Sequence, residues 1–360
     1  IGEALLLSIL GEKVKIRQFE ALQQSLSQSN LKISPDHLEM SSYWGTRSGC
    51  NITRVGSDGR NEDVAKPEQE GIFKSGNPRK ILQEKKNIET WGGILPDLVP
   101  RIYAYQEDHS SASLLIEFIS GPTLEAMIIS HSPVELNEAL DHLKKTLRMI
   151  WDKTIEYKPR PIDYMEQLQR RLDAIREVHP DFFREEQKLN NLNLSSTEQL
   201  IERCRLQEAE IKAPFTVFGH GDFNINNILF NNQKQRIHFI DLYRSHRADY
   251  LEDIAVIMVS NFRLPLFDPV LRARLNLVIR ELFLFSRNYA ASMKDQTFAL
   301  RLALALARSF YTSTRFELNV KLAREMALRA IFLLESVAYH HEHKLDRKDF
   351  SLAEDILYFG

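Results

Sequence analysis

The spacing of apolar positions divides this chain of 360 residues into a first part typical of strands and a second part typical of helices. In the first part, short apolar segments end at glycine, proline or charged residues, which predicts strands at 38–44, 52–55, 71–75, 100–105 and 113–118. Helical spacing occurs there twice, at 13–29 and at 81–88. Pro78 stands near the start of the second of these helices. This order predicts a small sheet with accompanying helices.

The second part has long apolar stripes with helical spacing. They lie at 134–157, 162–178 and 197–211, and again at 277–285, 299–310 and 322–337. Gly121 and Pro122 stop the last strand of the first part, and a helix is expected behind Thr123. We therefore expect two domains, residues 1–119 and 120–360, the second with a helical core.

Composition limits the classes of function. The chain is 43% hydrophobic and 27% charged, as ordinary globular proteins are, and its net charge of −2 gives no electrostatic reason to expect nucleic acid or an acidic membrane as partner. No apolar run approaches the roughly 18–20 residues that span a bilayer. Residues 4–10 are apolar, but they lack the flanks of a signal peptide. Cys50 and Cys204 form no disulfide framework, so we expect a cytoplasmic protein.

The strongest chemical signal lies between residues 220 and 241. The segment begins His220-Gly221-Asp222, Asn227 follows five residues after the aspartate, and Asp241 comes directly after an apolar strand. Asp222 can accept a proton from an attacking hydroxyl. Asn227 and Asp241 offer the hard oxygen ligands that Mg²⁺ prefers. A catalytic aspartate, a metal-binding asparagine and a metal-binding aspartate, in that order, are what a kinase active site requires.

These motifs resemble the aminoglycoside phosphotransferase and choline kinase group, whose catalytic loop has the form H-G-D-x-x-x-x-N. The similarity continues in Asp241-x-x-Arg244, in Asp249 before the next helix, and in Asp253-Ile254-Ala255 within it. The resemblance implies an α+β, two-lobed protein-kinase-like fold. Its small antiparallel-sheet lobe, residues 1–119, would bind the nucleotide. Its larger, mostly helical lobe, residues 120–360, would carry the catalytic loop and the substrate pocket.

The resemblance also assigns roles in the amino-terminal lobe. Such kinases place a strand lysine on the nucleotide phosphates and hold it with a glutamate of the following helix, which implies Lys74 and Glu84. Glu89 is a possible substitute, but Glu84 lies on the apolar, inward stripe; the alternative is a surface lysine and a solvated glutamate. Backbone groups near Glu117 and Phe118, before the connection between the lobes, would hold the adenine.

Two further segments of this lobe are considered: one has two possible roles, and the other has no expected chemical role. The turn at 44–51 contains glycines that would let backbone N–H groups approach phosphate, but G-x-G-x-x-G is absent, so an ordinary hairpin is equally compatible. The charged segment at 57–70 is expected to be a solvated loop.

The remaining polar residues around the motif are expected to be structural. His220 would hold the loop by hydrogen bonds, and Asn224 and Asn226 would bond loop backbone. Asp249 would cap a helix and Asp253 would brace the catalytic loop. After Asp241, we favour a pair between Arg244 and a loop carboxylate, with His246 and Arg247 facing water, over a basic rim for anions.

The sequence thus predicts an enzyme that uses Mg²⁺ and ATP (or GTP) and moves the γ-phosphate to a hydroxyl of a small molecule, such as an aminoglycoside, amino alcohol or sugar. A protein Ser/Thr kinase is the first alternative, but Asp-Phe-Gly and Ala-Pro-Glu are missing. The second is an inactive nucleotide-binding regulatory module, which would be favoured if Asp222, Asn227 or Asp241 were replaced. Acids such as Glu317 and Glu335 cannot be placed around an acceptor by sequence, and the oligomeric state is not predicted.

Overall fold

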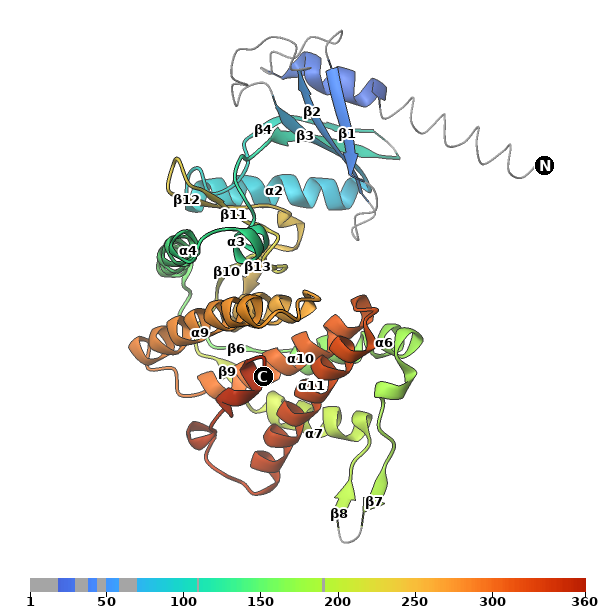
Figure 1. Ribbon diagram of the computed structural model, residues 1–360, viewed down its shortest axis with the longest axis vertical. Coiled ribbons are helices and arrows are strands. Elements are labelled where there is room, and N and C mark those ends of the chain that lie inside the picture. The colour runs from blue at the N-terminus through green and yellow to red at the C-terminus, as the bar shows by residue number, and fades with distance from the viewer. Residues whose placement is uncertain (1–18, 30–37, 44–49, 58–69, 109, 190–191) are drawn as a thin grey trace, which may run out of the picture. The chain divides into compact units, whose positions relative to one another are not determined.

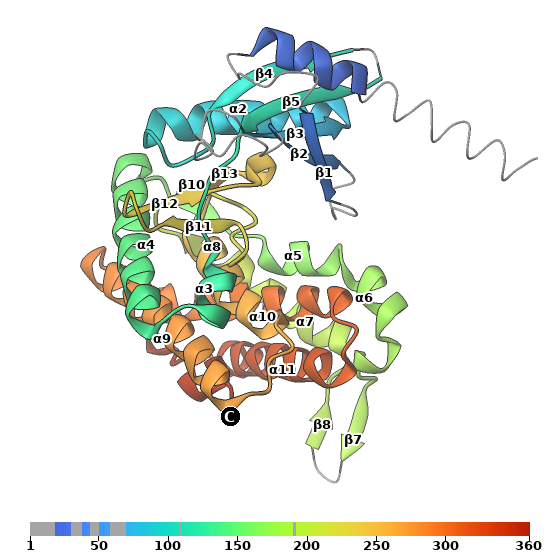
Figure 2. The ribbon, with the colours of Figure 1, turned by 45° about the horizontal axis from the view of Figure 1, so that its top comes forward.

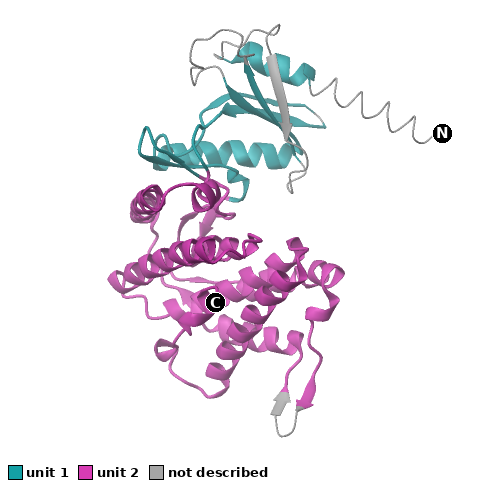
Figure 3. Cartoon of the chain, viewed as in Figure 1, with its two compact units in different colours: residues 1–122, 229–244 teal, residues 123–228, 245–360 magenta. Residues whose placement is uncertain are grey.

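The computed structural model describes residues 19–29, 38–43, 50–57, 70–108, 110–189 and 192–360 (Figure 1). The chain folds into two compact units. Unit 1 consists of residues 1–122 and 229–244, and unit 2 of residues 123–228 and 245–360 (Figure 3). Unit 1 thus takes up a second, later piece of the chain. The assignment of nucleotide binding to residues 1–119, and of the catalytic loop and substrate pocket to residues 120–360, stays a prediction.

Unit 1 is built on an antiparallel sheet of five strands. They are β1 (Leu38–Tyr43), β2 (Asn51–Ser57), β3 (Gly71–Gly76), β4 (Ile102–Glu107) and β5 (Ala112–Glu117), in the spatial order β1-β2-β3-β5-β4. The described strands lie where the short apolar segments predict them. β3 is the central strand, and its side chains Phe73, Lys74 and Ser75 are buried.

Helices cover the two faces of this sheet. Residues 19–28 are helical, and their Leu22 and Leu26 pack with Phe73 and its neighbours on one face (Figure 1). Side chains alternate along a strand, so Lys74 points to the other face. There it meets α2 (Pro78–Ile94). The Asn77 side chain caps α2 by accepting from the backbone N–H groups of Arg79 and Lys80.

A later segment of the chain completes unit 1. β11 (Ile228–Asn231) and β12 (Arg236–Phe239) form a two-stranded hairpin, followed by the 3₁₀ turn η4 (Leu242–Arg244). Phe239 N donates to Leu98 O at 2.8 Å, and its ring lies edge-on to Trp91 of α2, with centroids 5.8 Å apart. Asn87 Nδ2 of α2 donates to Leu242 O at 2.6 Å. These contacts fix the backbone on both sides of Asp241.

Gly121 lies where the two pieces of unit 1 approach each other. Its φ of +137° is a conformation that L side chains rarely adopt, and an added Cβ would lie 2.6 Å from Phe230 O. Phe230 N donates to Pro122 O at 3.0 Å. The close approach of two backbones therefore requires glycine here.

Unit 2 is mostly helical. Its helices are α3 (Leu124–Ser130), α4 (Pro133–Thr154), α5 (Tyr164–Gln169), α6 (Leu172–Val178), α7 (Thr197–Ala209), α8 (Leu251–Ser260), α9 (Pro269–Ser292), α10 (Phe298–Ser313) and α11 (Val320–Glu342). α10 is buried on nearly all sides and packs against α5, α8 and α11, while α4 and α9 lie side by side (Figure 2). A helix that is apolar all round belongs in the core.

Short strands and 3₁₀ turns complete unit 2. The antiparallel pairs are β6 (Arg160–Pro161) with β9 (Lys212–Ala213), β7 (Gln187–Leu189) with β8 (Leu192–Leu194), and β10 (Val217–Gly219) with β13 (His246–Ala248). The 3₁₀ turns are η3 (Pro180–Phe182), η5 (Asn261–Arg263), η6 (Thr314–Phe316), η7 (Arg347–Asp349) and η8 (Glu354–Leu357).

Several expectations differ from the fold or fall outside it. The helix expected at 162–178 is two helices, with Arg170 and Arg171 between them, although no glycine or proline stands there. β13 was not expected as a strand. Residues 13–18 of the first helix, 44–49 of the glycine-containing turn and 58–69 of the charged loop lie outside the described residues. No helix in the described ranges is both long enough and apolar enough to cross a membrane.

Candidate functional site

Lys74 and Glu84 form the charged centre of unit 1. Lys74 Nζ makes an ion pair with Glu84 Oε1, and the side chains are only 7% and 6% exposed. Glu84 lies on the buried face of α2 together with Ile81 and Ile88, as its spacing in the sequence predicts. The pairing predicted for these two residues is therefore present in the structure.

Lys74 also faces Asp241. Its Nζ lies 3.6 Å from Asp241 Oδ1, and the aspartate side chain is 35% exposed. Burial lowers the pKa of Lys74, but the charges of Glu84 and Asp241 outweigh it, and the net pKa is raised. Lys74 is thus a cation at neutral pH, held by one buried carboxylate and close to another that solvent can reach.

The backbone at Asp241 is left-handed, with φ of +62°. Aspartate tolerates this conformation better than most residues. Asp241 comes two residues after the end of β12, and Asn87 Nδ2 donates to the carbonyl of the next residue, Leu242. A small pocket here is lined by Cys50, Ile52, Lys74, Lys80, Glu84, Asp241 and Tyr243. Unit 1 therefore gathers a cation and an accessible carboxylate in a concave site.

Glu117 and Phe118 lie at the end of β5, away from that pocket's lining. The Glu117 carboxylate accepts from Arg101 N, Nε and Nη2 at 3.1, 3.2 and 3.2 Å. The Phe118 ring lies under the Arg54 guanidinium, 4.1 Å from its centroid. Neither residue lines the pocket at Lys74, and the role predicted for their backbone groups stays a prediction.

In unit 2, the segment His220-Gly221-Asp222, for which the sequence predicts a catalytic role, is held by Asp253 of α8. His220 N and Gly221 N donate to the two Asp253 carboxylate oxygens at 2.6 and 2.9 Å. Gly221 has φ of +76°, which accounts for glycine between the histidine and the aspartate. Buried His220 accepts at Nδ1 from Asp222 N at 3.3 Å. The bracing roles predicted for Asp253 and His220 are confirmed by these contacts.

The Asp222 carboxylate is positioned by side chains of unit 2. Asn224 Nδ2 donates to Asp222 Oδ1 at 2.6 Å, and Asn224 Oδ1 accepts from Arg263 Nη1 at 2.9 Å. As expected, Asn224 Nδ2 also donates to loop backbone, at 3.4 Å from Asp222 O, but its shorter bond goes to the carboxylate. Arg263, on η5, has no motif that marks it in the sequence.

Asn227 points its amide nitrogen back into the loop. Its Nδ2 donates to Asp222 O at 2.8 Å, which leaves the amide oxygen as the atom suited to a metal ion. Exposed Asn226 lies in the same loop. The structure therefore brings Asp222 and Asn227 together in unit 2, and Lys74, Glu84 and Asp241 together in unit 1.

Asp249 has a larger role than the helix cap expected for it. Leu251 N donates to its Oδ1 at 3.2 Å, as a cap requires. Its other oxygen is paired with fully buried Arg301, which also binds Asp295, and accepts from Tyr164 OH at 3.0 Å. No sequence spacing predicts these partners, because Tyr164 lies on α5, Arg301 on α10 and Asp295 in the connection before α10.

The basic residues after Asp241 divide differently from the favoured expectation. Arg244 is exposed and contacts the Tyr243 side chain, with its guanidinium 5.0 Å from the ring centroid. Arg247 does not simply face water: its Nη1 donates to Thr154 O at 2.6 Å, and its Nε lies 3.1 Å from Glu156. His246 Nε2 lies 3.5 Å from Glu252. Arg247 therefore anchors β13 within unit 2, whereas His246, with its side chain 50% exposed, faces water as expected.

Chemically, the two sets match the needs of phosphoryl transfer. A cation held in place can bind the phosphates during transfer, and oxygen ligands can coordinate Mg²⁺. An oriented carboxylate can accept the proton of an incoming hydroxyl.

Comparison with known proteins gives a family match. Residues 90–282, more than half of the chain, match the model of the phosphotransferase enzyme family (APH). The matched range includes Asp222, Asn227 and Asp241 but begins after Lys74 and Glu84. No curated protein matches the chain.

Solved structures give further, more distant likenesses. An aminoglycoside-3'-phosphotransferase of type VIII is 18% identical, with 75% of this chain and 92% of that chain covered and a TM-score of 0.46. APH(3'')-Id of Streptomyces rimosus is 19% identical (81% and 96% covered, TM-score 0.47). Ethanolamine kinase of Plasmodium vivax is 13% identical (83% and 82% covered, TM-score 0.45). Likenesses at this level say nothing about the acceptor of this chain.

Proposed function

Because the chain belongs to the phosphotransferase enzyme family and is a kinase for hydroxyl groups of small molecules, we propose that it transfers the γ-phosphate of ATP (or GTP). One observation carries the proposal: buried Lys74 is held between Glu84 and Asp241. A lysine in this setting keeps its charge and its position, which is what contact with nucleotide phosphates requires.

Lys74 and Glu84 act on the nucleotide. Glu84 cannot reach solvent well, so its task is to aim Lys74 rather than to react. Lys74 would then meet the phosphates with little reorganisation, because its side chain is already ordered by the ion pair. Backbone groups at Glu117 and Phe118 would hold the base, as expected from the sequence.

Asn227 and Asp241 would hold Mg²⁺. Their donor atoms fit the ion, since one is an amide oxygen whose nitrogen is engaged by Asp222 O and the other belongs to a partly exposed carboxylate. When bound, MgATP supplies the phosphoryl group and a metal charge that offsets the charge of its phosphates.

Asp222 orients the acceptor hydroxyl and takes its proton. Asn224 fixes one carboxylate oxygen, and Asp253 fixes the backbone before it, so the carboxylate is held on two sides. The acceptor remains a hydroxylated small molecule, for which aminoglycosides, amino alcohols and sugars are candidates. The inactive-module alternative is disfavoured because Asp222, Asn227 and Asp241 are all retained.

The test is Asp222→Asn in a screen of hydroxylated metabolites for ATP consumption. The variant keeps the size and hydrogen bonding of the side chain but loses the charge that accepts the proton. General-base contributions are typically about 10²–10⁴-fold, so transfer should fall by that range while ATP affinity stays near that of the wild type.

Asp141→Asn is the matched control, because Asp141 is an exposed aspartate on α4 with the same chemical change. It should leave transfer unaltered. If Asp222→Asn transfers phosphate within a few-fold of the wild-type rate, the base must come from another group and the assignment of Asp222 is wrong.

A further inference from the structure

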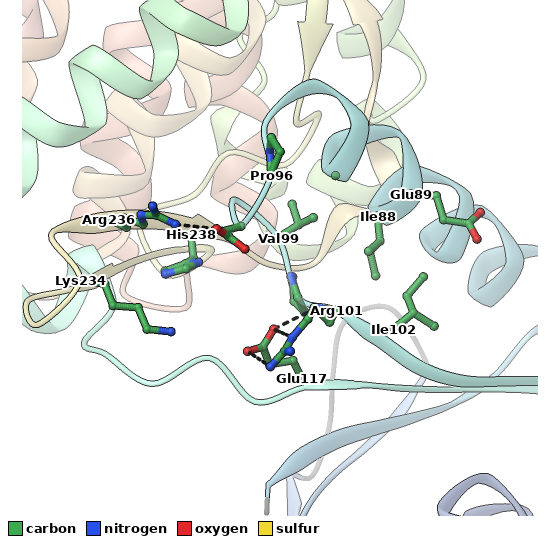
Figure 4. A pocket seen from close by; sticks show the side chains of 13 residues that line it. Ile88, Glu89, Pro96, Val99, Arg101, Ile102, Glu117, Lys234, Arg236 and His238 are labelled. Carbon is green, nitrogen blue, oxygen red and sulfur yellow. Dashed lines mark hydrogen bonds and ion pairs between the residues drawn. The ribbon is translucent and has the colours of Figure 1, made fainter. Parts of the chain in front are cut away.

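Unit 1 contains a second pocket that shares no lining residue with the one at Lys74. It has a volume of about 870 Å³ and lies between the end of α2, the segment that leads into β4, and β12 (Figure 4). Nothing in the proposed phosphoryl transfer uses its side chains. Two of its polar side chains, those of Arg236 and His238, come from one strand.

That strand is β12, whose two faces differ. Lys234, Arg236 and His238, at alternate positions, line the pocket. Ile237 and Phe239, between and after them, are buried in the core of unit 1. Because alternate side chains of a strand share a face, Arg236 and His238 of β12 lie along one wall, and Lys234 of the turn before β12 adds a third nitrogen-bearing side chain to the lining.

The pocket lining holds three cations, Arg101, Lys234 and Arg236, and three carboxylates, Glu89, Asp97 and Glu117. Arg101 is held by Glu117, and Arg236 Nη1 by Asp97 at 2.6 Å. Glu89 forms an ion pair with Lys85, which does not line the pocket. Within the part of the chain that the structure describes, no carboxylate forms an ion pair with Lys234 Nζ. In Figure 4 the Lys234 side chain extends toward the Arg101–Glu117 pair.

His238 adds an unsatisfied polar side chain. It is 7% exposed, and neither ring nitrogen makes a hydrogen bond of ordinary geometry in the described ranges, although the backbone of Asp97 lies close. Burial lowers the pKa of His238, so the ring is neutral at pH 7 and can donate one hydrogen bond. Buried polar groups are normally paired, so this exception calls for a partner.

The opposite wall of the pocket is apolar. Ile88 of α2 and Ile102 of β4 face it, with Val99 between them in sequence. A free inorganic ion would leave this wall uncovered, whereas an organic group attached to an anion would cover it.

From these contacts we propose that the pocket binds a small organic molecule with a terminal oxyanion. Lys234 and, after a small rotation of its ring, His238 contact the oxyanion, and Ile88, Val99 and Ile102 contact the organic group. The pocket is lined by the Glu117 side chain, whereas the proposed nucleotide site uses the backbone there, so both could be occupied together.

The experiment is a titration followed by NMR of the histidine rings, with MgADP at saturation so that added anions cannot enter the nucleotide site. Phenyl phosphate, benzoate and inorganic phosphate are the probes, and His238→Gln assigns the His238 signals. We expect phenyl phosphate or benzoate to shift these signals saturably. Lys234→Gln should weaken that binding about tenfold or more, since it removes a charge-assisted contact.

Lys86→Gln is the matched control, because Lys86 is exposed on α2 and does not line the pocket. It should not change the dissociation constant. Tighter binding of phenyl phosphate identifies a phosphate ester, and tighter binding of benzoate a carboxylate. Absence of a saturable His238 shift with all three probes, or equal weakening by Lys86→Gln, overturns the proposal. If inorganic phosphate binds as tightly as phenyl phosphate, Ile88, Val99 and Ile102 do not contribute to binding, and that part of the proposal is wrong.

Discussion

Lys74 is a residue whose removal has two separable effects. Lys74→Ala should weaken nucleotide binding strongly, because it deletes the cation proposed for the phosphates. It also leaves Glu84 buried without its partner, and breaking a buried pair typically costs about 3–5 kcal/mol. Nucleotide binding is therefore measured by calorimetry at a temperature where circular dichroism shows the variant folded.

The double variant Lys74→Met, Glu84→Gln separates these effects. It removes both charges, so most of the lost stability should return while nucleotide binding stays weak. Unchanged ATP affinity in the folded single variant would exclude Lys74 from the nucleotide site.

Asp241 combines a charge with an unusual backbone conformation. Asp241→Asn keeps a side chain that tolerates positive φ and removes only the charge, so stability should change by less than about 1 kcal/mol. Mg²⁺-dependent nucleotide binding should be lost. Asp241→Ala should lose the same binding and, in addition, about 1 kcal/mol of stability because alanine is less suited to this conformation.

Binding of nucleotide with and without Mg²⁺, together with urea midpoints, checks both variants. Normal MgATP binding by Asp241→Asn would assign the metal to another carboxylate.

Among the helices, α8 has the clearest influence on the proposed chemistry, because its Asp253 accepts from two backbone N–H groups of the catalytic segment. Asparagine can accept only one of these bonds with its single amide oxygen. Asp253→Asn should therefore reduce phosphoryl transfer and cost roughly 1–3 kcal/mol of stability. Asp173→Asn, an exposed aspartate on α6, is the control. Wild-type turnover in Asp253→Asn would show that the segment keeps its geometry without this brace.

Glu208 links α7 to α5, since its carboxylate accepts from Met165 N at 3.1 Å. Burial raises the pKa of Glu208 to about 7. Below about pH 4.5, both the folded and the unfolded chain hold this proton, and the group adds no pH dependence. Between there and pH 7, the unfolded chain releases the proton first, so stability falls as pH rises. Above pH 7 the loss is constant, at most on the order of 3 kcal/mol.

Glu208→Gln should remove this dependence. The variant should gain stability over the wild type at pH 8 but not at pH 4.5, and urea unfolding at the two values measures it. Glu210→Gln, an exposed acid at the end of the same helix, should behave like the wild type. Equal differences between Glu208→Gln and wild type at both pH values would contradict the raised pKa.

Across the chain as a whole, local patterns predicted most elements and the family. Strand segments and helical stripes depend on neighbours a few residues apart, so they can be recognised without the fold. The order of Asp222, Asn227 and Asp241 is likewise a local signal, and so is the place of Glu84 on the inward face of α2. Their chemical roles stay predictions.

What could not be predicted depends on residues far apart in sequence. Arg301 meets Asp249 across 52 residues, and Arg263 meets Asn224 across 39. Nothing in the spacing of the 229–244 segment indicates that it belongs to unit 1. The break between α5 and α6 also lacks a local cause, because no proline or glycine marks it.

The close approach at Gly121 has a consequence for how this chain can vary. With Phe230 O 2.6 Å from the place of a Cβ, every other amino acid would have to move a backbone that is tied by its own hydrogen bond. In a library of all single substitutions selected for a folded product, Gly121 should be among the least tolerant positions. The exposed Lys234, a few residues beyond the same contact, should accept nearly any polar replacement. As far as folding alone is concerned, the β11–β12 hairpin would thus tolerate change at its turn and hardly any where it meets Gly121.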